Sequence, residues 1–179
     1  MALTVEQIRA TDDNEKLYDL LSTELQRLLP KELIKDRDLY HATLTVIPRG
    51  LRAMAGMHFF DVSMTLDDLA WHFGNQNDPR DLAETLNGLR ELELPEIADL
   101  FEQAWKIMEP HFEDLRSDKV TSDNFYEWLE EIGAEDKIDP MNDFIWDYCK
   151  KLGKNGLLES WAPYARKYPE RCVAAEAQV

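Results

Sequence analysis

The sequence has few of the residues that build disulfide frameworks, metal centres or membrane spans. Only two of its 179 residues are cysteines, Cys149 and Cys172, and their positions match no zinc-ligand pattern. We therefore expect two reduced thiols, as is usual in the cytoplasm. No run approaches the roughly 20 apolar residues that a membrane helix needs, and the N-terminus lacks the basic and apolar regions of a signal peptide. These absences predict a cytoplasmic protein.

Signals of β-structure are also scarce. The chain has seven glycines, no sustained alternation of apolar and polar residues, and no Asn-Gly pair joining two β-like segments. Apolar residues instead recur at spacings of three and four, which is typical of amphipathic helices. We predict an all-α fold, a single-domain bundle of about eight helices over residues 1–173, followed by a frayed C-terminal tail at 174–179.

The clearest helix signals lie in residues 78–116. Asp78 can cap a helix that begins with Pro79, and Pro95 can open a second helix in the same way. We predict that this second helix continues to Arg116 and buries an apolar stripe that includes Leu100 and Phe101.

Other helix boundaries are predicted from local caps and stops. The residues from Thr4 to Gln7 have the spacing of a capping box, and residues 49–60 are small and apolar enough for a buried helix that crosses close to its neighbours. Further expected features are a cap at Asp12-Asp13-Asn14, a helix over 33–47, a cap at Thr65 for a helix over 66–73, a cap at Ser122 or Asp123 for a helix over 125–132 that stops at Gly133, and a helix that starts at Asp139-Pro140.

Positive charge is the most conspicuous shortage. There are 36 acidic and 20 basic residues, which gives a formal net charge of -16. Residues 61–147 hold 24 acids and 6 bases, whereas residues 1–60 hold 9 and 8, and residues 148–179 hold 3 and 6. Such an excess disfavours nucleic acid and anionic membranes as partners and favours a cationic protein. Its concentration in one block indicates an interaction surface, the alternative being charge that only maintains solubility.

The acidic block contains a row of carboxylates opposite the apolar stripe of the predicted 95–116 helix. Its members recur at three to seven residues, so each lies one or two turns, roughly 5 or 11 Å, from the next. A second group follows between residues 123 and 131. The candidate partner-binding residues are Glu96, Asp99, Glu102, Glu109, Glu113, Asp123, Glu127, Glu130 and Glu131.

Catalytic motifs are missing. The sequence has no nucleophile elbow, no Gly-rich phosphate loop and no paired-histidine metal motif. His58, Asp61 and His72 are close enough in sequence to suggest a metal site, but the pattern is weak. We predict no catalytic residues, no bound metal and no cofactor, with a metal-dependent hydrolase around His58, Asp61 and His72 as the alternative.

The segment from Leu69 to Met108 resembles a known family. A short helix ends in His72-Phe73-Gly74-Asn75, a second helix includes residues 83–89, and a break leads to residues 97–104. In these features the sequence resembles the small bacterial DNA-mimic protein family, an all-helical group. The resemblance implies that carboxylates substitute for DNA phosphates and occupy a DNA-binding protein.

Together these observations predict a non-enzymatic interaction protein, monomeric or homodimeric, that binds a basic protein through acidic helix faces between residues 61 and 147. In the DNA-mimic form of this hypothesis the partner is a DNA-binding protein, and the chain itself binds neither nucleic acid nor membrane. An immunity protein that neutralises a basic nuclease toxin would use the same electrostatics and remains a second alternative.

Overall fold

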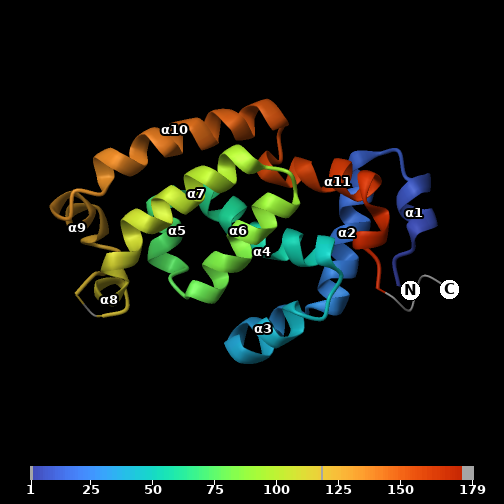
Figure 1. Cartoon of the computed structure of the whole chain (residues 1–179), viewed down its shortest axis with the longest axis horizontal. Helices are drawn as coiled ribbons and strands as arrows, with labels where there is room; N and C mark the ends of the chain where they lie inside the picture. The colour runs from blue at the N-terminus through green and yellow to red at the C-terminus, as the bar shows by residue number, and fades with distance from the viewer. Residues whose placement is uncertain (1, 118, 175–179) are drawn as a thin grey trace.

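The computed structural model describes residues 2–117 and 119–174, and over these residues every regular element is helical (Figure 1). The predicted all-α class is confirmed, whereas the predicted tail at 174–179 lies outside the described residues except for Ala174. The α-helices are α1 (Val5–Ala10), α2 (Asn14–Leu28), α3 (Arg37–Leu44), α4 (Arg49–Leu66), α5 (Leu69–Asn75), α6 (Pro79–Glu91), α7 (Pro95–Met108), α8 (Phe112–Leu115), α9 (Phe125–Glu131), α10 (Glu135–Leu152) and α11 (Trp161–Lys167). Four 3-10 helices occur among the described residues: η1 (Lys31–Lys35), η2 (Glu109–His111), η3 (Gly156–Ser160) and η4 (Pro169–Arg171).

Several helix starts lie where the sequence predicts them. The Thr4 hydroxyl accepts a hydrogen bond from the Gln7 backbone N–H, and the Gln7 side chain accepts one from the Thr4 N–H, which completes the capping box. Asp13 caps α2 and Asp78 caps α6, where Pro79 is the first helical residue. At the end of α9, Gly133 has a φ of 64°, a left-handed conformation that suits glycine.

Other boundaries were predicted wrongly because a local signal was given too much weight. Thr65 does not cap a helix, since α4 continues to Leu66 and Asp68 caps α5 by accepting from the Trp71 N–H at 2.7 Å. Neither Ser122 nor Asp123 caps α9, which follows Asn124. The 33–47 segment divides into η1 and α3.

Two prolines behave differently from the prediction. Pro140 lies inside α10 and does not start it, because the helix begins at Glu135. Pro110 breaks the helix predicted to run to Arg116, so that α7 ends at Met108 and η2 and α8 follow. A proline ring clashes with the carbonyl four residues earlier and has no N–H to donate, which explains the break after α7.

The centre of the fold is a close crossing of α4 and α6, seen in the middle of Figure 1. A Cβ atom on Gly56 would lie 2.4 Å from the Glu84 carbonyl oxygen, and one on Gly88 would lie 2.5 Å from the Ala53 carbonyl oxygen. The Thr85 hydroxyl donates to the Gly56 carbonyl at 2.9 Å across the same contact. The predicted close crossing of the 49–60 helix is therefore confirmed, and glycine is required on both helices.

An aromatic cluster packs beside this crossing. Phe101 from α7 is fully buried and contacts Phe60 from α4 and Phe73 from α5, with ring centroids 5.2 and 5.3 Å apart. The predicted burial of Phe101 is confirmed, whereas Leu100 is only half-buried. The cluster fixes α7 against the core, so the opposite face of α7 is held toward solvent. Among the described residues, no helix combines the length and apolarity needed to cross a membrane.

Replacing Gly88 with alanine tests the α4–α6 crossing. In an ordinary helix this change stabilises by roughly 1 kcal/mol, but here the added methyl group meets the Ala53 carbonyl and forces the helices apart. We expect Gly88→Ala to lower the free energy of unfolding by about 1–3 kcal/mol in urea denaturation. Asn87→Ala, an exposed neighbour in α6, is the control and should change stability little. A stabilised Gly88→Ala protein would contradict the close crossing.

Candidate acidic binding surface

The nine candidate carboxylates come from four consecutive elements and the loop before α9. Glu96, Asp99 and Glu102 lie on α7, Glu109 on η2 and Glu113 on α8. Asp123 precedes α9, and Glu127, Glu130 and Glu131 lie on it. All are exposed except Glu102, which is half-buried. Because Pro110 ends α7, the five-member row expected on one straight helix is instead a three-member row on α7 with two carboxylates beyond its end.

Among the residues that the structure describes, Glu102 is also the one candidate that forms ion pairs. Its carboxylate lies 3.2 Å from the guanidinium of Arg90 on α6 and 3.7 Å from the Lys106 ammonium one turn along α7. The charge of Glu102 is therefore partly compensated within the molecule. This makes it a weaker anchor for a partner than its position in the row suggested.

The other eight candidates form no ion pair with any described residue. Between residues 92 and 147 the sequence has four bases, and three of them already have partners: Lys106 pairs with Glu102, Lys119 with Asp114 at 3.2 Å, and Arg116 binds the side-chain oxygen of Asn77 at 3.2 Å. Among the described residues of this stretch, Lys137 is the one base with neither an ion pair nor a side-chain hydrogen bond. The surface thus presents carboxylates whose charge is balanced only by solvent ions.

The sequence reasoning missed a further row on α10. Asp136, Asp139, Asp143 and Asp147 are all exposed and recur at spacings of three and four, so they follow one face of this helix. Asp147 pairs with Lys150 at 3.0 Å, whereas the other three have no ion pair among the described residues. The spacing can be read from the sequence. The prediction that the helix starts at Asp139-Pro140 left Asp136 outside the helix, so the row was not recognised.

The fold brings the acidic helices together. In Figure 1, α10 lies along α7 and runs in the opposite direction, while α8 and α9 occupy the end of the molecule where α7 finishes. At the other end of this pair, burial and the nearby Glu96 carboxylate raise the pKa of Tyr148 on α10. Between α8 and α9, a polar hollow of about 290 Å³ is lined by Asp114, Lys119, Asn124, Glu127, Trp128 and Glu131.

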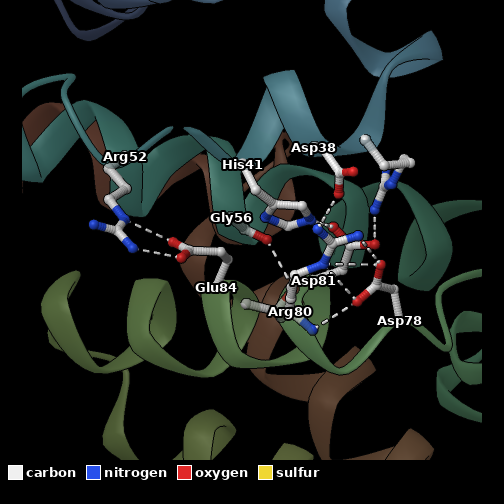
Figure 2. A network of polar contacts seen from close by, with 10 residues as sticks. Asp38, His41, Arg52, Gly56, Asp78, Arg80, Asp81 and Glu84 are labelled. Carbon is white, nitrogen blue, oxygen red and sulfur yellow. Dashed lines mark hydrogen bonds and ion pairs between the residues drawn. The ribbon is translucent and has the colours of Figure 1, made fainter. Parts of the chain in front are cut away.

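Acids near α3, α4 and α6 are arranged differently, because arginines form ion pairs with them (Figure 2). Arg52 on α4 holds Glu84 on α6 by two parallel hydrogen bonds of 2.8 and 2.5 Å. Beside this pair, Arg80 binds Asp78 at 2.8 Å and Asp38 at 2.6 Å, which joins α6 to α3. The Arg80 guanidinium holds the pKa of Asp78 down to about 2. These carboxylates stabilise the fold and are not available to a partner.

One group of possible metal ligands lies within this network. Atoms of His41, Asp78 and Asp81 approach within 4.8 Å of one another. Arg37 already pairs with Asp81, and Arg80 with Asp78. Burial and the two arginines lower the pKa of His41, so its imidazole is neutral near pH 7. The residues are therefore arranged as an internal ion-pair network between α3 and α6.

The metal site suggested by His58, Asp61 and His72 is not assembled. Among the described residues, their ligand atoms do not form a group of the kind seen at His41. Asp61 accepts from the Leu157 N–H at 2.9 Å and so anchors η3 to α4. His72 contacts the Ser63 hydroxyl at 3.0 Å within the aromatic cluster, and burial lowers its pKa to about 3. Each side chain has a separate structural role, because the three point to different neighbours.

The pH dependence of stability tests the position of Asp61. Burial raises its pKa from 3.8 to about 6, so its favourable contribution is present below pH 3.8 and is lost as pH rises through about 6. We expect Asp61→Asn to become progressively more stable relative to wild type from pH 4 to pH 7, by about 2–3 kcal/mol over the range. The measurement is urea denaturation of both proteins at each pH. A constant difference would show that Asp61 is not buried as described.

Comparison with known proteins identifies the family of the chain. The family description DMP19-like protein matches residues 46–168, which include all nine candidate carboxylates and the α10 row but not α1 to α3. No curated protein and no solved structure matches the chain. Because the matched segment covers most of the sequence, the chain belongs to the DMP19-like protein family.

Proposed function

We propose that the protein is a DNA mimic without catalytic activity, which binds a basic DNA-binding protein through the carboxylates of α7 to α10. The proposal is based on one difference: acidic side chains of α6 form ion pairs within the protein, whereas most of those on α7 to α10 do not. Acids of α6 are largely held by arginines, whereas eight candidate carboxylates and three of α10 have no ion pair among the described residues. Family membership agrees with this function, since the family is one of DNA mimics.

The spacing of the charges supports a substitute for phosphates. Along α10, residues three or four apart are separated by roughly 4.5–6 Å of helix. One DNA strand carries a phosphate charge about every 3.4 Å of helix axis, so a single row of carboxylates is too sparse. The row on the neighbouring helix α7 adds further carboxylates beside the α10 row. Two antiparallel acidic helices therefore approach the charge density that a DNA-binding groove accommodates.

Rigid helices make these charges more effective than a disordered acidic tail. Phe101 and the core hold α7, and Ile138 and Ile145 are fully buried on the inner face of α10. The carboxylates are thus positioned before binding, which reduces the ordering cost that a flexible segment would incur. A positioned row of one sign also accelerates encounter with an oppositely charged partner.

Charge reversal at the end of α7 tests this function. Glu109→Lys with Glu113→Lys replaces two exposed, unpaired carboxylates and should leave the fold intact. We chose this pair because Glu102 is already compensated by Arg90 and Lys106. Binding to the DNA-binding protein captured at low salt should weaken by at least about tenfold, mainly through a slower on-rate.

The matched control is Glu6→Lys with Asp19→Lys, which makes the same change in net charge on α1 and α2. It should reduce affinity far less, because those residues lie outside the acidic surface. Surface-captured kinetics at low and high salt, with duplex DNA as competitor, give the comparison. Equal losses in both variants would mean that net charge alone governs binding, and binding unaffected by duplex DNA would contradict mimicry.

A further inference from the structure

An exposed tyrosine lies where α9 meets the rest of the molecule. Tyr126, in the first turn of α9, is 42% exposed. Its ring is nearly parallel to that of Trp71 on α5, with an interplanar angle of 12° and ring centroids 6.3 Å apart. The preceding residue, Phe125, is buried and meets Trp71 edge-on at 4.9 Å. Tyr126 is therefore held by neighbouring rings while much of its own surface faces solvent, as in the aromatic anchors of protein interfaces.

Carboxylates from two other parts of the chain lie beside this ring. The Tyr126 hydroxyl donates a hydrogen bond to Asp67 at 2.6 Å and lies 3.2 Å from a carboxylate oxygen of Asp68. Asp67 and Asp68 form the turn between α4 and α5. Burial, together with the charges of Asp67 and Asp139, raises the pKa of Asp68, which places Asp139 of α10 in the same group. Three carboxylates thus gather near one aromatic ring.

These carboxylates have no cationic partner. Asp67, Asp68 and Asp139 form no ion pair with any described residue. The segments that form the site contain neither lysine nor arginine over residues 61–75, 120–136 and 138–149. Lys119 and Lys150, which adjoin these segments, have acidic partners of their own. Lys137 is two residues from Asp139 and so lies on the other side of α10.

The hydroxyl of Tyr126 does not cancel the charge of its acceptor. Burial and the hydrogen bond to Asp67 raise the pKa of Tyr126, so the hydroxyl stays protonated and neutral. Asp67 is exposed, and its carboxylate can accept further hydrogen bonds. One place on the surface therefore offers both an aromatic face and an accessible negative charge.

Arginine is the side chain that uses both features. Its guanidinium group is planar, so it can stack on an aromatic face and also donate several hydrogen bonds to a carboxylate. A lysine ammonium is a compact and more strongly hydrated charge, and it forms cation–π contacts less often. The combination of ring and carboxylates therefore favours arginine over lysine.

We propose that Tyr126 is an anchor for an arginine of the basic partner, whose guanidinium stacks on the exposed ring and donates to Asp67. Asp68 and Asp139 supply further negative charge at the same place. This inference rests on the proposed function, because the arginine belongs to the protein that binds the acidic surface. It extends that surface from α9 and α10 to the turn between α4 and α5.

Hexa-arginine and hexa-lysine peptides, which carry the same side-chain charge, test the anchor by calorimetry with the full chain at low salt. Wild type should bind hexa-arginine more tightly than hexa-lysine. Tyr126→Leu should weaken hexa-arginine binding by about two- to fivefold, as expected for one exposed cation–π contact, and leave hexa-lysine binding nearly unchanged. Tyr126→Phe should bind hexa-arginine nearly as well as wild type, because the ring remains.

Phe144→Leu is the matched control. Phe144 on α10 is 44% exposed, and its ring packs on Tyr148 instead of lying beside Asp67. Its replacement should change neither affinity. Circular dichroism identifies any variant that fails to fold. If Tyr126→Leu does not fold, Asp67→Asn decides, since it should weaken hexa-arginine binding more than hexa-lysine binding.

Two results would overturn the anchor. The first is equal affinity of wild type for the two peptides. The second is hexa-arginine binding that the folded Tyr126→Leu protein, or Asp67→Asn in its place, leaves unchanged. If duplex DNA still competes with the partner in either case, the mimicry stands without the anchor. An intact peptide preference without competition by duplex DNA would instead remove the mimicry alone.

Discussion

The crossing of α4 over α6 is the contact on which the remaining structure depends. Gly56 and Gly88 allow each helix to meet backbone atoms of the other, and the buried hydroxyl of Thr85 bonds across the contact. Because α6 is fixed in this way, the short turn before Pro95 directs α7 back along it, and α10 then packs on α7. The acidic rows are therefore positioned by a contact to which none of their own carboxylates contributes. Any change that opens the crossing should disturb the acidic surface without touching it.

The protein separates two uses of its carboxylates. Near α3, α4 and α6 they are held by Arg37, Arg52 and Arg80 and join helices to one another. On α7 to α10 nearly all lack such partners, so their mutual repulsion is relieved only by salt or by a bound cation. A bound basic protein would reduce that repulsion. The electrostatic free energy of the complex would then be lower than that of the free surface. This difference provides a driving force for binding that does not require a large apolar interface.

Much of the fold could be predicted from local sequence, because caps such as Asp13 and Asp78 act through hydrogen bonds a few residues away. The end of α7 and the start of α10 were predicted less well, since Pro110 follows the end of one helix whereas Pro140 lies inside another. The exposed carboxylates from α7 to α9 could be listed from the sequence. Their role in binding a partner remains a prediction. The row on α10 was not predicted, because the start of that helix was predicted wrongly. Its position beside α7 depends on contacts between distant segments that no local pattern encodes.

Hydrogen–deuterium exchange of the protein with and without the proposed DNA-binding partner tests the central claim most directly. Backbone amides of exposed helices exchange through local openings, and a bound partner slows them where it contacts the surface. The account predicts slower exchange in α7, α9 and α10, unchanged exchange in α1 to α3, and recovery of the original rates when duplex DNA displaces the partner. Protection confined to α1 to α3, or protection that duplex DNA leaves in place, would contradict it.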